Sequence, residues 1–321
     1  MKRFIRSCVI SLLSLTFFCG VCLLHAQPYP NRPIQLVIAG APGDGIDISA
    51  RAAAEELTKI LKVPVLPLNK PGGAGTVAAD FAAKSPKDGY TLHYGSSQGT
   101  IIGPALRPSE TPFNPVRDFG FLGLHVYFPI VISVQADAPW KKLSDVVEYA
   151  KKNPGSFRCG TVGGIHLQLE TVKAATGTDI AQVPFKGGSQ AITALLGGHI
   201  ESTFLAVSIS HPHYESGKLR GILLDTGVPS LPEIPTWAQL GFKQSLHPSW
   251  FGFLAPAGIP EEAEKVLIPA VERVVKNPEL SAKLQKLWFV PTYLSPSEFQ
   301  RLHRTNYEDA LVQFKRLGAT Q

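Results

Sequence analysis

The sequence is poor in cysteine, and this scarcity excludes a disulfide framework. Only four of its 321 residues are cysteine, and three of them (Cys8, Cys19 and Cys22) lie in an N-terminal segment that we expect to be removed. Cys159 would then be alone in the mature chain, so no internal disulfide can form. We interpret Cys159 as a buried structural thiol and not as a nucleophile, because that is the more frequent role of a lone cysteine.

The chain also lacks a cluster of positive charge, an internal repeat and a low-complexity segment. Its formal net charge is +6. Removal of residues 1–26 takes away Lys2, Arg3 and Arg6 and no acidic residue, which leaves 28 basic residues against 25 acidic ones, or +3. The remaining Lys and Arg are spread along the chain, so we expect no nucleic acid partner.

Cofactor and metal motifs are incomplete. The run Gly43-Asp44-Gly45 lacks the third glycine of the dinucleotide fingerprint, and Asn69 stands where that fingerprint expects an acidic residue. The glycine-rich turn at 72–75 is followed by Thr76 and not by the Lys of a P-loop. We interpret His211 and His213 as a loop pair, because the pattern offers no third metal ligand. No cofactor is expected.

The N-terminus has the layout of a signal peptide. Lys2, Arg3 and Arg6 precede an apolar run of about 17 residues, which is shorter than a membrane-spanning helix and contains Ser and Thr. Small Ala26 ends the segment. We therefore predict that residues 1–26 are cleaved and that the mature chain is soluble in the periplasm. Neither Cys19 nor Cys22 follows the small residue that lipid attachment requires.

Short β-rich runs alternate with helical stretches through the rest of the chain, which predicts an α/β fold. A mature length of about 295 residues favours two lobes. Two apolar segments, 119–134 and 249–258, are predicted as hinge strands that cross between them. We expect two mixed, mostly parallel sheets flanked by helices, with residues 27–124 and 249–321 in lobe 1 and residues 125–248 in lobe 2.

Four turns at predicted strand ends are rich in glycine and hydroxyl residues. They lie at 41–47, 95–100, 160–166 and 185–190, two in each lobe. In open α/β sheets, ligands bind beyond the carboxyl ends of the strands, where helix N-termini offer unpaired N–H groups. Glycine lets the backbone approach the ligand, and Ser or Thr adds a neutral donor. The set predicts a site for a small anion that needs no salt bridge.

One alternative is an enzyme. Gly95-Ser96-Ser97-Gln98-Gly99 matches the G-x-S-x-G nucleophile elbow, and Asp225 and His247 follow in the order of an α/β-hydrolase. Against this interpretation, Gly103 and the prolines at 104 and 108 are predicted to break any helix after the elbow, and no oxyanion-loop motif precedes it. We predict that the chain is not an enzyme and keep an esterase with Ser97 as the alternative.

Longer motifs carry a family resemblance. The segments YPNRPIQLVI, NKPGGAG, SPKDGYTL, VPFKGGSQA and SWFGFLAPAGIP occur in this order, and with them the mature chain resembles, nearly end to end, the periplasmic receptors of tripartite tricarboxylate transporters, the TctC or Bug family. The resemblance implies a type II periplasmic-binding fold that closes around a carboxylated solute. It implies membrane transport subunits as partners, although a sensor kinase would use the same closure. We expect a monomer.

The resemblance also implies ligand contacts in the four turns. Asp47 is alternatively an N-cap of the following helix, and Lys186 a surface cation. The sequence departs from the family at Asp44, where glycine is usual, at Leu205, where Asp is frequent, and in a shorter third turn. The expected contacts are Gly43, Asp44, Gly45, Ile46, Asp47, Ser96, Ser97, Thr161, Gly163, Gly164, His166, Lys186, Gly187, Gly188 and Leu205.

These departures leave the ligand open among di- and tricarboxylates, amino acids and related organic acids. Asp44 would repel an anionic solute unless its carboxylate points away or meets a cationic group. It therefore motivates the hypothesis of an amino acid whose ammonium group faces Asp44.

Overall fold

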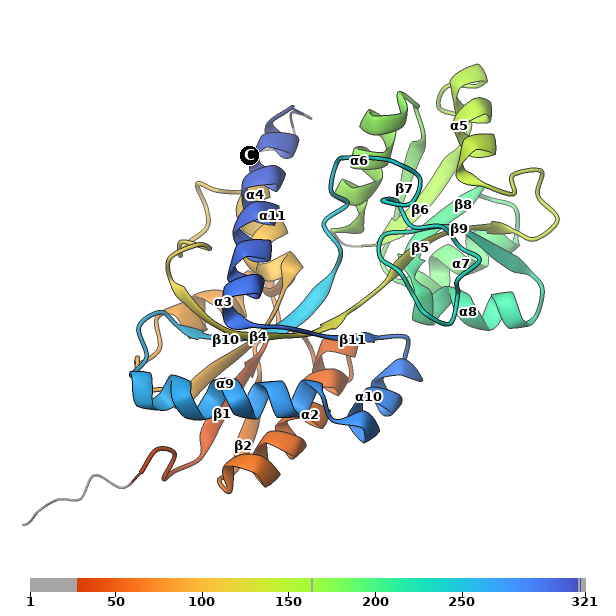
Figure 1. The fold of residues 1–321 in the computed structure, drawn as a ribbon. Coiled ribbons are helices and arrows are strands. Elements are labelled where there is room, and N and C mark those ends of the chain that lie inside the picture. Colours follow the sequence, from red (N-terminus) through yellow and green to blue (C-terminus); the bar gives the residue numbers. More distant parts are fainter. Residues whose placement is uncertain (1–27, 163, 317, 319–321) are drawn as a thin grey trace, which may run out of the picture.

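The protein is described here by a computed structural model that covers residues 28–162, 164–316 and 318. The predicted signal peptide and Gly163 lie outside the described residues. The chain forms two lobes, each an α/β unit with its own mixed sheet and flanking helices (Figure 1). Within the described part of the chain, every helix is too short or too polar to cross a membrane.

The larger lobe contains a six-stranded sheet in the order β11-β4-β10-β3-β1-β2. Strand β1 pairs in parallel with β2 and β3, whereas β10 pairs antiparallel with β3 and β4, and β11 antiparallel with β4. The strands are β1 (Ile34–Ile38), β2 (Val65–Asn69), β3 (Thr91–Ser96), β4 (Phe119–Tyr127), β10 (Trp250–Pro256) and β11 (Val290–Leu294).

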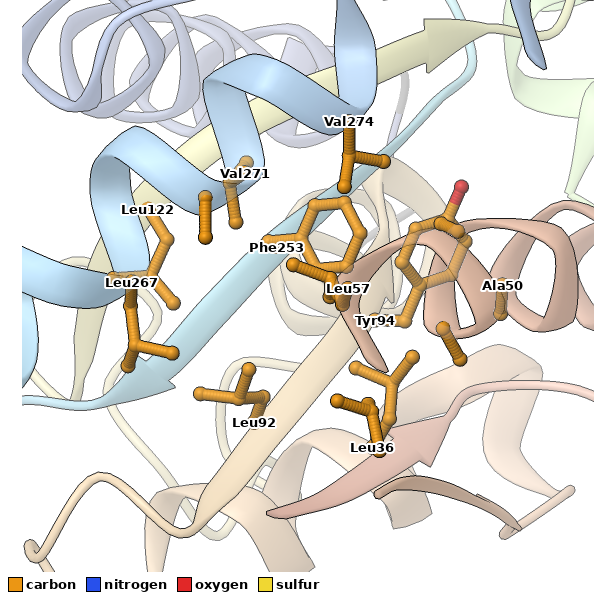
Figure 2. Packing of buried hydrophobic residues seen from close by; sticks show 14 of the residues in the cluster. Leu36, Ala50, Leu57, Leu92, Tyr94, Leu122, Phe253, Leu267, Val271 and Val274 are labelled. Atoms are coloured by element: carbon orange, nitrogen blue, oxygen red, sulfur yellow. The ribbon is translucent and has the colours of Figure 1, made fainter. Parts of the chain in front are cut away.

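Helices cover both faces of this sheet. On one face, α2 (Gly45–Leu61) and α9 (Glu261–Val275) bury apolar stripes against alternate strand residues such as Leu36 and Leu92 (Figure 2). On the other face, apolar residues of α3 and α11 pack against β4 and β10. The remaining elements of this lobe are α10 (Pro278–Gln285), α3 (Thr76–Ala83), α11 (Pro296–Arg316), the turn η1 (Gly73–Gly75), η2 (Gln98–Ile102) and α4 (Gly103–Leu106).

The smaller lobe contains a five-stranded sheet in the order β7-β6-β8-β5-β9. Helices α5 and α6 cover one face, and α7 contributes to a separate apolar cluster. Cys159 is buried in β6, and burial raises the pKa of its thiol to about 12, which suits a structural role. The elements are β5 (Ile130–Gln135), α5 (Leu143–Lys152), β6 (Arg158–Val162), α6 (Ile165–Thr176), β7 (Ala181–Phe185), α7 (Gly188–Leu196), β8 (Ser202–Ala206), α8 (Val207–Glu215) and β9 (Leu219–Leu224).

The chain passes between the lobes twice. The first predicted hinge strand is two strands, because β4 ends at Tyr127 in the larger sheet and β5 begins at Ile130 in the smaller one. The N–H of Phe128 donates to Ser249 O at 2.8 Å, which ties the two passages together. Strand β4 thus stays in the larger sheet beyond residue 124, where we predicted the lobe boundary, and the exact boundaries remain a prediction.

Two expectations need correction. Parallel pairs do not predominate, because the strands next to the two crossings, β4, β5 and β10, pair antiparallel with their neighbours. His211 and His213 lie on helix α8 and not in a loop, although Pro212 stands between them. Burial of Val207 and Ser210 on this helix favours it despite the hydrogen bond that proline removes.

Candidate functional site

A cavity of about 300 Å³ lies between the two lobes, and we call it the inner cavity. The larger lobe lines it from the ends of β1 and β3, the start of α2 and both chain passages. The smaller lobe lines it from the end of β6 and the starts of β5 and α6. The lining residues are Ala39, Ile46, Ala74, Ser96, Ser97, Gln98, Phe128, Ile130, Val162, Gly164, Ile165, Ser249 and Phe251.

Helix α2 opens onto the inner cavity with an N-terminus that no side chain caps. Its N-cap residue is Asp44, but the Asp44 carboxylate accepts from the N–H of Ala41 at 2.9 Å and makes no cap bond to the helix. The first-turn N–H groups of a helix have no partner within the helix and carry partial positive charge. Ile46, in that turn, lines the cavity, so the α2 N-terminus can serve an anion there.

Helix α6 opens onto the same cavity from the smaller lobe. Its N-cap residue is Gly164, which has no side chain with which to cap, and Ile165 is its first residue. Both residues line the inner cavity. Two uncapped helix N-termini, one from each lobe, therefore contribute to a single cavity.

In the second predicted loop, the turn at 95–100, the hydroxyl groups of Ser96 and Ser97 are placed as hydrogen-bond donors. Ser96 Oγ accepts from the N–H of Gly99 at 3.2 Å, and Ser97 Oγ accepts from the N–H of Trp250 at 3.4 Å. A hydroxyl that accepts in this way keeps its O–H proton for another acceptor. Ser96 and Ser97 can therefore donate to an oxygen atom of a ligand in the inner cavity.

Close backbone packing holds this loop in place. A Cβ atom on Gly99 would lie 2.8 Å from the carbonyl carbon of Gly75, whose own φ is +105°. Both conditions require glycine. The glycine-rich turn at 72–75 thus packs against the second loop, which explains why Ala74 reaches the cavity.

A second cavity of about 330 Å³ adjoins the inner one and shares Ala74, Gln98 and Gly164 with it. His166 lines this outer cavity together with Arg107 and Glu110, whose side chains lie 3.9 Å apart. The Gln98 side chain stands against Gly164, because a Cβ atom there would lie 2.1 Å from Gln98 Oε1. Gln98 therefore separates the two cavities where the lobes meet.

The first predicted loop is only partly at the cavity. Of its expected contacts, Ile46 lines the cavity, but Gly43, Asp44, Gly45 and Asp47 do not. Asp44 is exposed and its carboxylate bonds to its own loop, so it does not face the inner cavity. The hypothesis of an amino acid whose ammonium group faces Asp44 therefore loses the observation that motivated it.

The interpretation of Asp47 as the N-cap is wrong. Asp47 lies inside the first turn of α2, where its carboxylate accepts from Arg51 Nε, from Asn69 Nδ2 and from the N–H of Gly43. Burial acts to raise the pKa of Asp47, but these hydrogen bonds hold it below its usual value. The charge is thus compensated within the larger lobe.

Other predicted contacts lie away from the inner cavity. Thr161 is buried and accepts from Gln182 Nε2 at 3.0 Å. Leu205 is buried in the apolar cluster formed with α7, so a leucine there serves packing. Lys186 is exposed, and Gly187 and Gly188 start α7 without lining either cavity. Their role as ligand contacts remains a prediction.

Sequence reasoning missed most of the apolar lining. Phe128, Ile130 and Phe251 were included only in predicted hinge strands, and Ser249 was predicted to begin the second of them. Val162 and Ile165 lie inside the third predicted turn, at 160–166, but were not among the expected contacts. No local signal identifies which of these side chains faces a cavity, because that depends on how the lobes meet.

The elbow at Ser97 does lead into a helix, contrary to our prediction. Residues 98–102 form a π-helical turn and residues 103–106 continue as α4. Pro104 is tolerated because it lies in the first turn of α4, where its missing N–H is not needed. The argument from helix-breaking residues against an esterase therefore fails.

The side chains nevertheless do not form a hydrolytic triad. His247 Nε2 bonds Gln313 Oε1 at 2.8 Å, and its Nδ1 has no hydrogen-bond partner among the described residues. Asp225 Oδ1 instead accepts from the N–H of Ile130 at 2.9 Å. Because the base must bond both nucleophile and acid, this geometry does not support catalysis by Ser97. The described residues also contain no group of His, Cys, Asp or Glu suited to a metal ion.

Sequence relatives agree with the resemblance. The profile described as "Tripartite tricarboxylate transporter family receptor" matches residues 49–316. The chain is 31% identical over 304 residues to the UPF0065 protein in the gbd 5' region of Cupriavidus necator, which covers 92% of this chain and 90% of that one. It is 32% identical over 241 residues to Protein BugT of Bordetella pertussis, which covers 73% and 74%.

Solved structures share the fold. A TctC solute binding protein from Polaromonas, solved without ligand, has a TM-score of 0.80 at 26% identity and covers 90% of this chain and 99% of that one. An R. palustris protein solved with adipate has a TM-score of 0.74 at 27% identity and covers 90% and 98%. The predicted type II periplasmic-binding fold is confirmed, and the chain belongs to the receptor family of the tripartite tricarboxylate transporters.

Proposed function

We propose that this chain is a periplasmic receptor, exported by a cleaved signal peptide, that captures a small carboxylated solute between its lobes. It performs no chemistry on the solute and presents it to the membrane subunits of a tripartite tricarboxylate transporter. Lobe 1 (27–124 and 249–321) and lobe 2 (125–248) close on the solute as a monomer.

One observation carries this proposal. The uncapped N-termini of α2 and α6 come from opposite lobes and open onto one cavity that also holds the hydroxyls of Ser96 and Ser97. Helix N-termini and hydroxyl donors stabilise a carboxylate without a salt bridge. Because the donors come from both lobes, a bound carboxylate favours their approach. The adipate in the R. palustris protein supports a carboxylate as the ligand class.

The first test is the identity and affinity of the ligand. Native mass spectrometry of residues 27–321 is expected to detect a co-purifying carboxylate, and calorimetry on the stripped protein should give saturable binding at one site. Ser96→Ala and Ser97→Ala should each weaken binding about tenfold or more, because each removes a hydrogen bond to a charged group.

Ser85→Ala is the matched control, since its hydroxyl donates to Phe81 O outside both cavities. It should leave the affinity unchanged. Hydrolysis of an ester substrate that disappears in Ser97→Ala would contradict the proposal and favour the esterase.

A further inference from the structure

The inner cavity is apolar and uncharged apart from its helix N-termini. Its described lining residues include no charged side chain, and hydrocarbon side chains make up most of the surface. Its polar side chains are three serines and Gln98. The cavity can therefore satisfy one carboxylate through N–H and O–H donors, but its side chains offer no cation for a second one.

Two arginines of the larger lobe, neither of which lines the inner cavity, have acidic partners. Arg51 pairs with Asp47 at 2.9 Å within α2, and Arg107 lines the outer cavity, where Glu110 lies 3.9 Å away. Burial of a charged group without a partner is costly, and the cost grows with each additional charge. A compact di- or tricarboxylate would place at least one carboxylate against hydrocarbon.

One wall of the cavity is aromatic and rigid. The rings of Phe128 and Phe251 stack with centroids 5.7 Å apart and planes 24° apart, and Phe289 supports both at 5.6 and 6.0 Å. Phe128 also lies beside the N-terminus of α2, since a Cβ atom on Gly45 would be 3.8 Å from its ring. An apolar group therefore meets aromatic surface next to the carboxylate-binding N–H groups.

A second wall, which the smaller lobe contributes, is aliphatic. Ile130, Val162 and Ile165 line it, and Ile165 is the first residue of α6. Both anion-binding helix ends are thus flanked by hydrocarbon. Apolar lining from both lobes favours a ligand whose body is removed from water in the cavity.

We propose, building on the carboxylate-receptor function above, that the ligand is a monocarboxylate with an uncharged apolar body, either aryl or alkyl. The carboxylate binds the N-termini of α2 and α6 and the hydroxyls of Ser96 and Ser97. The body lies between the aromatic wall and the aliphatic wall.

Calorimetry on the stripped mature chain tests this with benzoate, hexanoate, malate and citrate as probes. Benzoate or hexanoate is expected to bind at least about tenfold more tightly than malate and citrate. Malate or citrate that binds as tightly as the better monocarboxylate would overturn the apolar-body inference and leave the receptor function intact. If none of the four binds, the carboxylate-receptor function itself fails, and this inference with it.

A pair of matched variants tests the location. Val162→Thr keeps the shape of the aliphatic wall and adds a hydroxyl, so it should weaken binding of the better monocarboxylate several-fold, up to about tenfold. Val312→Thr makes the same change on the exposed surface of α11 and should leave the affinity unchanged. Equal affinities of Val162→Thr and the wild-type protein, with equal melting temperatures, would contradict the placement of the apolar body.

Discussion

Asp225 is a buried carboxyl at the junction of the two lobes. Its Oδ1 accepts from the N–H of Ile130 at 2.9 Å, and its own N–H donates to Ile130 O at 3.0 Å. It thereby holds the start of β5, directly after the first passage between lobes, against the end of β9. Burial raises the pKa of Asp225 to about 7.

This raised pKa predicts a loss of stability as the pH rises. Above the unfolded-state pKa of about 3.9, the unfolded chain has released the proton, whereas the folded chain keeps it up to about pH 7. The folded state therefore binds more protons in this window, and its stability falls with increasing pH. Asp225→Asn keeps an acceptor for Ile130 and removes the ionisation.

The melting temperature at pH 8 minus that at pH 5 should consequently be about 3–5 °C higher in Asp225→Asn than in the wild-type protein. Scanning fluorimetry at four pH values between 5 and 8 measures it. Asp137→Asn, at an exposed position, is the control and should follow the wild-type profile. A wild-type profile in Asp225→Asn would show that Asp225 is ionised throughout.

At the scale of elements, the N-terminus of α6 and the loop after β3 meet across the lobe boundary. Gly164 presents a bare backbone there, and Gln98 Oε1 occupies the space that a Cβ atom would take, 2.1 Å from its ideal position. Gly164 has φ −70°, so alanine fits the backbone conformation without strain. A Cβ atom at position 164 would, however, displace the Gln98 side chain.

Gly164→Ala should therefore weaken ligand binding about tenfold and leave the melting temperature of the unliganded protein nearly unchanged, because the clash arises only where the lobes meet. The double variant Gly164→Ala/Gln98→Ala should recover part of the affinity lost in Gly164→Ala. Calorimetry over the complete double-mutant cycle measures the coupling. Strictly additive effects would contradict contact between these residues.

At the scale of the whole molecule, side chains join the lobes on more than one side. Gln313 of α11 donates to Thr171 of α6, and the ring of His211 on α8 lies over Trp288, with centroids 3.7 Å apart. Trp288 precedes β11 of the larger lobe. Because His211 and Trp288 come from different lobes, any change in their relative orientation alters this contact.

Closure on a ligand should therefore change the tryptophan emission through Trp288. A saturating carboxylate is expected to shift or quench the emission of the wild-type protein, and Trp288→Phe should abolish the change. Trp140→Phe is the control, since Trp140 packs against Tyr149 and Phe157 within the smaller lobe. A ligand-dependent change that persists in Trp288→Phe would contradict movement at this contact.

The types of secondary structure and the family could be predicted from the sequence, because both depend on residues that are close together in the chain. The predicted alternation of short strands and helices is present in both lobes, because periodicity and Gly or Pro boundaries act over a few residues. Ser96 and Ser97 were found in the same way, as hydroxyls at a strand end, and both line the inner cavity. The prediction that Pro104 breaks a helix after the elbow was wrong, because Pro104 lies in the first turn of α4, where its missing N–H is not needed.

Only the tertiary structure decided which side chains line the cavity, because that depends on strand register and on the meeting of two lobes. Leu205 and Val162 are both apolar and strand-borne, yet one fills a core and the other lines the cavity. The carboxylate of Asp44 bonds within its own loop and that of Asp47 bonds Gly43, Arg51 and Asn69, and their role as ligand contacts remains a prediction. Contacts between residues far apart in the chain leave no periodic signal in the sequence.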